Sequence, residues 1–244
     1  MPSESQHRGK TGRLSDRVAL ITGASRGIGR AVAKRFAEEG AIIVALARTR
    51  DALESLDDEI YSLTGKNAVL VDSDLTQYDV IDQVGEALFH RFKRLDIIVG
   101  VAGTLGQLSP ISHIPLNIWE QTFALHVTAN WRLLRSVDAL LRQSDAGRSL
   151  FVTCDQGTKA SPFWGPYGAS KAALDQMVLT YAQEMVETNV KANLIDPGPV
   201  RTALRLKAFP GEDKAKLPMP EDITEKFVEM ASASYEQTGQ RVTL

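Results

Sequence analysis

Short apolar runs alternate with segments of helical period along most of the chain. Seven runs, each bounded by Gly, Pro, Asp or other polar residues, predict strands at residues 18–21, 42–46, 68–71, 97–101, 150–153, 192–195 and the more polar 240–243. Because helical segments separate these runs, the pattern predicts repeated βαβ units. The predicted fold class is α/β, a single doubly wound domain whose parallel sheet of about seven strands carries helices on both faces.

The helical segments are amphipathic and differ in length. The first places Ile28, Val32 and Phe36 at steps of four. Further helices are predicted at residues 51–62, 80–92, 116–141 and 167–187. Five apolar residues share one stripe of the last of these: Leu174, Met177, Val178, Tyr181 and Met185. Such a stripe lies either in the core or in an interface between copies of the chain.

The chain is predicted to form one domain. Its 244 residues can bury an adequate core without metals or disulfides. Residues 1–16 are polar with mixed charge and are expected to form a flexible leader, followed by a single domain over residues 17–244. The segment 199–220, rich in Pro and Lys, is expected to be a mobile flap before the last helix rather than a domain boundary.

Composition and charge exclude several classes of protein. A formal net charge of −2 without any long Lys/Arg run argues against nucleic acid or an anionic membrane as a partner. No window reaches the roughly 18 apolar residues of a membrane span. The single cysteine, Cys154, excludes an intrachain disulfide and a cysteine cluster for zinc, so no metal is expected and a cytoplasmic location is predicted.

A glycine-rich loop follows the first predicted strand and opens a helix. It reads Thr22-Gly23-Ala24-Ser25-Arg26-Gly27-Ile28-Gly29. Backbone N–H groups and the positive helix end converge there, and glycines permit the tight turn and the close approach of a phosphate. The loop predicts a nucleotide pyrophosphate site, and the alternative is a plain turn between a strand and a helix.

The end of the second predicted strand indicates which nucleotide is bound. An NAD site places an acid there against the ribose 2′-hydroxyl, whereas this chain reads Ala45-Leu46-Ala47-Arg48. Arg48 and Arg26 can flank a 2′-phosphate without an acid to repel it. The pattern favours NADP(H), and the alternative is that both arginines are solvated surface charges.

A tyrosine and a lysine share one helix face in Tyr167-Gly168-Ala169-Ser170-Lys171. Their i, i+4 spacing brings both within reach of one ligand. A phenol can donate a proton to the oxygen of a carbonyl during hydride transfer if a nearby ammonium lowers its pKa. A tyrosine and a lysine at this spacing are common in helices. The combination of this pair with the glycine loop at residues 22–29 and with Pro197-Gly198 is much less common, so together they form a specific motif.

On these motifs residues 18–242 resemble the short-chain dehydrogenase/reductase family, which has a Rossmann fold. The resemblance implies an oxidoreductase that transfers a hydride between NADP(H) and a carbonyl or alcohol substrate. Tyr167 would act as acid/base, and Lys171 as the anchor of the cofactor ribose. It also implies a homodimer or homotetramer formed through the two longest helices.

The motifs and the resemblance together predict one cofactor site. Its expected residues are Gly23, Ser25, Arg26, Gly27, Ile28, Gly29, Arg48, Asp74, Leu75, Ala102, Gly103, Tyr167, Lys171, Pro197, Gly198, Val200 and Thr202. Asp74 follows the third strand and matches the segment that contacts adenine in the family, although on residue type alone an Asp at the end of a strand is more often a helix cap. Thr202 is expected to hydrogen-bond the nicotinamide carboxamide.

Three positions depart from the family pattern. Cys154 stands where a serine usually orients the substrate carbonyl, and a thiol is a weaker donor. Thr153 or Asp155 can substitute for it, and an inert buried cysteine is the remaining alternative. The usual Asn-Asn-Ala-Gly reads Gly100-Val101-Ala102-Gly103, which implies altered local hydrogen bonding.

The third departure is His126, which replaces an asparagine whose backbone carbonyl holds a relay water in the family. The main-chain relay can survive this change, and the ring itself either carries protons or packs in the helix. The expected catalytic residues are therefore Tyr167, Lys171, Cys154 and His126.

Two functional hypotheses follow. The first is an NADP(H)-dependent carbonyl reductase or alcohol dehydrogenase. The second is a non-catalytic NADP(H)-binding scaffold or sensor, since a Rossmann fold alone certifies no activity. Loops at 104–115, 157–166 and 200–220 would form the substrate pocket. Their apolar residues favour an apolar or aromatic substrate: Leu105, Leu108, Phe163, Trp164, Leu204 and Phe209.

Overall fold

Seven parallel strands form the centre of the molecule, and the computed structural model describes them within residues 12–244. Their order in the sheet is β3-β2-β1-β4-β5-β6-β7. The strands are β1 (Val18–Thr22), β2 (Ile42–Ala47), β3 (Val69–Asp72), β4 (Ile97–Gly100), β5 (Arg148–Val152), β6 (Lys191–Asp196) and β7 (Arg241–Thr243). Each predicted strand lies within two residues of an observed one, and the predicted α/β fold class is confirmed.

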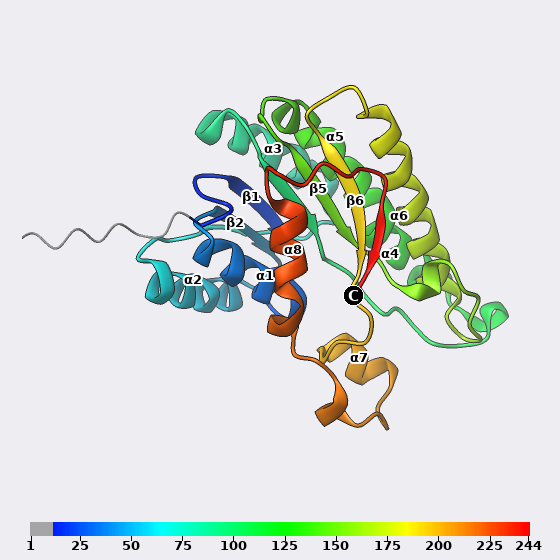
Figure 1. Cartoon of the computed structure of the whole chain (residues 1–244). Coiled ribbons are helices and arrows are strands. Elements are labelled where there is room, and N and C mark those ends of the chain that lie inside the picture. Colours follow the sequence, from blue (N-terminus) through cyan, green and yellow to red (C-terminus); the bar gives the residue numbers. More distant parts are fainter. Residues whose placement is uncertain (1–11) are drawn as a thin grey trace, which may run out of the picture.

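Helices cover both faces of the sheet (Figure 1). One face packs against α1 (Gly27–Glu38), α2 (Arg50–Thr64) and α8 (Thr224–Ala231), and the other against α3 (Tyr78–Phe92), α5 (Ala129–Arg142) and α6 (Gly165–Glu184). Strand side chains alternate between the two cores, as Ala19 and Leu20 do. Burial on both faces explains why the strands read as continuous apolar runs. In residues 12–244 no helix has the length and apolar character to cross a membrane.

The apolar stripe of α6 belongs to the core. Leu174, Val178 and Met185 are buried there, and Met177 and Tyr181 pack against the same cluster. Of the two alternatives that the sequence leaves open for this stripe, the structure therefore selects the core.

The prediction of one uninterrupted α-helix over residues 116–141 was wrong, because a π-helical turn divides the segment. The structure has α4 (Leu116–Phe123), a π-helical turn (Ala124–Thr128) and then α5. At this turn the side-chain amide of Asn130 donates to two backbone carbonyl oxygens of the helix, those of His126 (2.8 Å) and Leu125 (3.4 Å). A side chain inserted into the backbone ladder is an ordinary cause of such an interruption.

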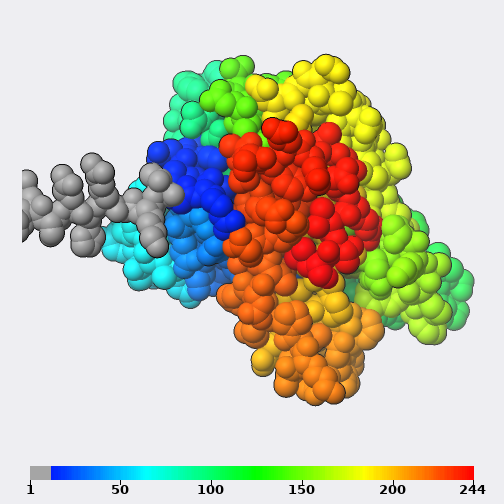
Figure 2. All heavy atoms as spheres, viewed as in Figure 1, coloured from blue at the N-terminus to red at the C-terminus, as the bar shows by residue number. Residues whose placement is uncertain are grey.

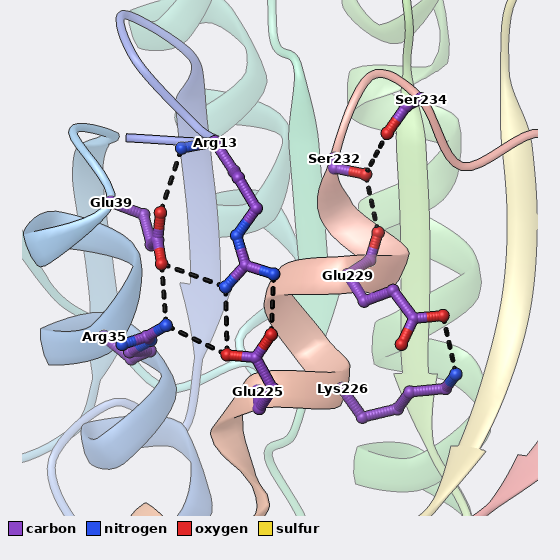
Figure 3. A network of polar contacts seen from close by, with 8 residues as sticks. All are labelled: Arg13, Arg35, Glu39, Glu225, Lys226, Glu229, Ser232 and Ser234. Atoms are coloured by element: carbon purple, nitrogen blue, oxygen red, sulfur yellow. Dashed lines mark hydrogen bonds and ion pairs between the residues drawn. The ribbon is translucent and has the colours of Figure 1, made fainter. Parts of the chain in front are cut away.

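The described chain packs against the domain before β1 begins. The expected leader lies mostly outside the described residues, but Leu14 is fully buried and its N–H donates to the carbonyl of Glu39. Arg13 pairs with both Glu39 and Glu225, and Arg35 joins the same two carboxylates (Figure 3). This network joins the segment before β1 to the end of α1 and the start of α8. The packed structure therefore begins before residue 17.

The segment between β6 and α8, for which the sequence predicts a mobile flap, leaves the sheet as an excursion. It contains α7 (Ala203–Ala208) and the 3-10 turns Lys214–Lys216 and Pro220–Ile223. Figure 2 shows it projecting from the body of the molecule. Two other 3-10 turns, Ile111–His113 and Asp155–Gly157, follow β4 and β5.

The contact between α3 and α5 depends on the absence of a side chain at Gly85. A Cβ there would lie 2.6 Å from the backbone oxygen of Ser136. We expect Gly85→Ala to lower the free energy of unfolding by about 1 kcal/mol or more, because the overlap outweighs the gain in helix propensity. Urea denaturation measures the change. Gly211→Ala, at a position with no atom within 4 Å, should stay within about 0.5 kcal/mol of the wild type. Equal stability of the two variants would contradict the prediction.

Candidate active site

The predicted site segments meet at one edge of the sheet. All strands are parallel, so their carboxyl ends lie on the same side. The chain fills the sheet outward from β1 to β3 and then from β4 to β7, which creates a crevice between β1 and β4. The glycine loop, Arg48, Asp74, Ala102, Cys154 and Pro197 each follow a different strand at this edge. The structure therefore assembles the segments that sequence motifs had located separately.

The glycine loop forms a cradle made of backbone. Gly23 and Gly27 have φ values of +67° and +56°. A Cβ on Gly29 would lie 2.8 Å from the carbonyl carbon of Gly23, and one on Gly23 would lie 3.0 Å from the backbone of Ala102. Arg26 occupies the N-cap position of α1 without a side-chain cap, so the first-turn N–H groups remain available to an anion. These features fit a dinucleotide pyrophosphate.

Thr22 reorganises the hydrogen bonds at the end of β4. Its hydroxyl oxygen accepts from the N–H groups of Val101 (3.1 Å) and Ala102 (3.2 Å). A single hydroxyl from β1 therefore serves two N–H groups of the segment Gly100-Val101-Ala102-Gly103, which lacks the polar side chains of the expected Asn-Asn-Ala-Gly. Sequence reasoning missed Thr22, although its position at the end of a strand was a signal.

The arginines after β2 lie beside acids. The guanidinium of Arg48 is 3.6 Å from Asp74 Oδ2, and 71% of its side chain is exposed. The second oxygen of Asp74 accepts from the N–H and hydroxyl of Thr76, which makes it a local turn acceptor. Arg50, which sequence reasoning missed, lies 3.4 Å from Asp72. Two exposed cations therefore stand near the end of β2.

Two of the expected cofactor residues, Leu75 and Val200, have side chains buried in the core. Only their backbone can serve a ligand. Arg26 is exposed at the start of α1.

Tyr167 and Lys171 are buried at the start of α6, where Pro166 begins the first turn. Their exposed fractions are 9% and 5%. Burial raises the pKa of Tyr167 well above its usual value, which keeps the phenol protonated. Burial also lowers the pKa of Lys171, whose Nζ donates to the carbonyl of Val152 (2.8 Å) and lies 6.0 Å from the Tyr167 ring centre. The pair combines a proton donor with an adjacent ammonium.

Cys154 follows β5 and adjoins the hydroxyl of Tyr167. Burial raises the pKa of its thiol, so the sulfur keeps its proton. Of the two neighbours that can substitute for it, Thr153 is buried and Asp155 is exposed. The thiol is therefore placed to donate a weak hydrogen bond beside the phenol.

His126 lies in the π-helical turn with both ring nitrogens engaged. Nε2 accepts from the N–H of Thr104 (3.0 Å), so Nδ1 carries the proton and faces the hydroxyl of Ser170 at 2.8 Å. That hydroxyl in turn donates to the carbonyl of Tyr167. The ring thus connects the loop after β4 with the catalytic helix.

Of the two alternatives for His126, a proton-carrying ring and a packed ring, its surroundings favour the packed ring. The ring is fully buried, and burial together with the charge of Lys171 lowers its pKa well below the usual value. A neutral ring whose two nitrogens are both engaged has no free site for a proton. The ring meets Tyr167 edge-on at 5.5 Å, so His126 is placed to hold Tyr167 in position.

The excursion after β6 covers the site. Thr202 caps α7 by accepting from the N–H of Arg205, and its methyl group approaches Gly27 of the cradle. Phe209 packs on Trp164 (5.6 Å between ring centres), and Trp164 packs on Tyr167 (5.5 Å). Aromatic side chains therefore form the wall beside the phenol.

Among the other apolar residues expected in the pocket, exposure varies. Leu105 is buried, Leu108 and Leu204 are half-buried, and Phe163 is 56% exposed. Phe163 also adopts a φ of +73°, which is uncommon for an aromatic residue and typical of functional loops.

Comparison with known proteins was made on sequence and on structure. The sequence profile of the short chain dehydrogenase family matches residues 17–213. The chain is 34% identical to the uncharacterized oxidoreductase YciK of Escherichia coli K12, over 93% of this chain and 90% of that protein. A short chain dehydrogenase from Shigella flexneri, crystallised with NADP, superposes with a TM-score of 0.92 at 33% identity, over 96% and 99% of the two chains. A 3-oxoacyl-[acyl-carrier-protein] reductase of Synechocystis is 29% identical over 93% and 94% of the two chains.

The buried neutral ring of His126 predicts a specific loss of stability in acid. Below about pH 6.5 the unfolded chain binds a proton at His126, whereas the folded chain does not. As the pH is lowered, the free energy of unfolding therefore falls by up to about 1.4 kcal/mol for each pH unit. His126→Asn should be less stable at pH 8 but lose less stability between pH 7 and pH 5, as measured by urea denaturation. His90→Asn, at an exposed position, serves as the control and should retain the wild-type slope. An unchanged slope in His126→Asn would refute the assignment.

Proposed function

Because this chain belongs to the short chain dehydrogenase family, we propose that it is an NADP(H)-dependent oxidoreductase acting on a carbonyl or alcohol. The observation that carries this proposal is the buried, protonated Tyr167 beside the ammonium of Lys171, at the edge of the sheet where the glycine cradle opens. A scaffold without activity has no need of this pair. The solved relative from Shigella flexneri that holds NADP supports the choice of cofactor.

The residues present fit NADP(H). The backbone cradle at Gly23 and Gly29 would hold the pyrophosphate, because a Cβ would fill it. Arg48 and Arg26 would flank the 2′-phosphate, and Arg50 adds positive charge nearby. The remaining expected contacts are Ser25, Gly27, Ile28, Asp74, the backbone of Leu75, Ala102, Gly103, Pro197, Gly198, Val200 and Thr202.

Each of the three catalytic residues would have a separate task in the reduction of a carbonyl. When bound, the reduced cofactor supplies a hydride to the carbonyl carbon. Tyr167 donates its hydroxyl proton to the oxygen that becomes the alcohol, and burial keeps that proton on the phenol beforehand. Lys171 stabilises the resulting phenolate and binds the ribose hydroxyls. Cys154 orients the carbonyl with a weak hydrogen bond.

The substrate class follows from the wall of the site. Trp164 lies edge-on to Tyr167, Phe209 packs at a tilt against Trp164, and Phe163 is exposed in the same loop as Trp164. Such faces bind apolar or aromatic groups through dispersion and desolvation. We therefore place aromatic aldehydes and ketones first among candidate substrates.

Pairing of copies through the two long helices stays a prediction. The outer face of α6 is accessible, as pairing requires, with Ala169, Ala172, Gln176 and Thr180 exposed along it. Small residues in this row allow close approach of a second helix.

Calorimetric titration tests the cofactor assignment. We expect micromolar NADPH binding and NADH binding at least about tenfold weaker, a gap of about 1.4 kcal/mol. Arg48→Glu should narrow the gap to below about threefold, because a carboxylate repels the 2′-phosphate. Arg91→Glu, a matched change at an exposed residue in the last turn of α3, should leave it intact. If neither NADPH nor NADH binds, the cofactor assignment and the proposed enzymatic function are both refuted.

Cys154→Ser separates an enzyme from a sensor. A hydroxyl is a stronger donor than a thiol, so turnover with NADPH and a panel of aromatic carbonyls should rise about tenfold. Tyr167→Phe is the control and should lose about 10²- to 10⁴-fold in kcat while retaining NADPH affinity. If NADPH binds but neither the wild type nor Cys154→Ser turns over any carbonyl, the chain is a cofactor-binding scaffold or sensor instead.

A further inference from the structure

A buried ion cluster lies one helical turn beyond Lys171. Arg241 of β7 donates to Oδ2 of Asp175 (2.5 Å), to Oδ2 of Asp196 (3.0 Å) and to the carbonyl oxygen of Cys154 (2.6 Å). Asp175 and Asp196 are only 6% and 5% exposed. Within residues 12–244 Arg241 is the one cation that forms an ion pair with either of them. Two buried carboxylates therefore share a single positive partner.

Sequence spacing alone would give Asp175 a different partner. Lys171 and Asp175 stand at i and i+4 on α6, where a lysine and an acid commonly pair. In the structure Lys171 instead donates to the carbonyl of Val152, and no ion pair in the described part of the chain includes it. Within residues 12–244 no hydrogen bond to the buried Oδ1 of Asp175 is formed, although the hydroxyl of Thr153 lies near enough to lower the pKa of this carboxyl. Arg241 and Lys171 are the cations that lower the same pKa, so the Lys171 ammonium is attracted to Asp175.

Arg241 is well suited to prevent that attraction. Its guanidinium remains charged at every accessible pH and presents several donors in one plane, so it can serve both carboxylates and a carbonyl together. A buried charge without a partner is strongly destabilising. Without Arg241, Lys171 is the remaining cation that acts on Asp175.

We propose that Arg241 is a positioning residue that neutralises Asp175 and Asp196 and thereby leaves the Lys171 ammonium free to act on Tyr167 and the cofactor ribose. The assignment rests on the proposed function, because only an active Tyr167 needs a free lysine beside it. Its direct consequence is electrostatic: removing Arg241 makes the site more negative wherever Asp175 or Asp196 stays ionised, and it draws Lys171 away from Tyr167.

Cys154 provides a probe of this effect that needs neither cofactor nor substrate. It is the one cysteine in the sequence, it is partly exposed, and it adjoins Tyr167. The titratable and charged groups around it are Tyr167, Lys171, Asp155, Asp175, Asp196 and Arg241. Lys171 lowers the pKa of this thiol, and uncompensated carboxylates would raise it. Only the thiolate reacts with an alkylating reagent, so the reaction rate reports the local charge.

The experiment measures the rate of Cys154 alkylation by iodoacetamide as a function of pH. The midpoint of the profile reports thiol ionisation, and its plateau reports access. For Arg241→Met we expect the midpoint to rise by about one pH unit or more, which is about tenfold slower alkylation at a fixed pH below it. Arg241→Lys retains the charge and should stay within about threefold of the wild-type rate.

Two further variants distinguish charge compensation from a merely structural link. Arg241→Met combined with Asp175→Asn and Asp196→Asn removes the cation and both acids, and it should return the rate to within about threefold of the wild type. Asp175→Asn alone keeps Arg241 and should lower the midpoint, so alkylation becomes faster. Asp175→Asn also keeps the test open if Arg241→Met fails to fold, which thermal unfolding will show.

Each result has a definite meaning. An unchanged midpoint in folded Arg241→Met, a triple variant as slow as Arg241→Met, or an unchanged midpoint in Asp175→Asn would each overturn the proposal. The alkylation profile and the NADPH titration are independent measurements. If no nucleotide binds but the alkylation midpoints shift as expected, the proposed function is refuted and the charge compensation by Arg241 is supported. If NADPH binds but the midpoints do not shift, the role of Arg241 is refuted and the proposed function stands.

Discussion

The parallel pairing of β1 with β4 is the constraint on which the rest of the site depends. The register Ala19↔Ile97 to Ile21↔Val99 brings the end of β1 against the end of β4. At that junction a Cβ on Gly23 would meet the backbone of Ala102, and the Thr22 hydroxyl accepts from two N–H groups of the loop that follows β4. The cradle is therefore rigid because backbone packs directly on backbone, and each further strand adds its loop to the same edge.

Burial decides the chemistry of the side chains placed around this edge. Tyr167 retains its proton because its charged form is poorly solvated, and the same desolvation keeps the His126 ring neutral. A neutral imidazole can accept from Thr104 and donate toward Ser170 at once, so it holds the catalytic helix without competing for protons.

Individual elements show which features of the structure could be predicted from the sequence and which could not. The strands were predicted to within two residues, since parallel strands buried on both faces read as apolar runs. The helix over 116–141 was wrong at its centre, because no local pattern shows that the Asn130 amide bonds to His126 and Leu125 inside the ladder. Cys154 and Tyr167 were identified by spacing within motifs, but their contact across two elements required the fold.

Local periodicity and motif spacing by themselves determined the α/β class, the glycine cradle and the pairing of Tyr167 with Lys171 on one helix face. These features depend on residues a few positions apart, and backbone geometry fixes what such neighbours can do. Only the tertiary structure decided which partner each buried charge takes. Asp175 pairs with Arg241, 66 residues away, rather than with Lys171 four residues away. The reason is that burial makes an ion pair depend on which groups the sheet and its helices bring together in space.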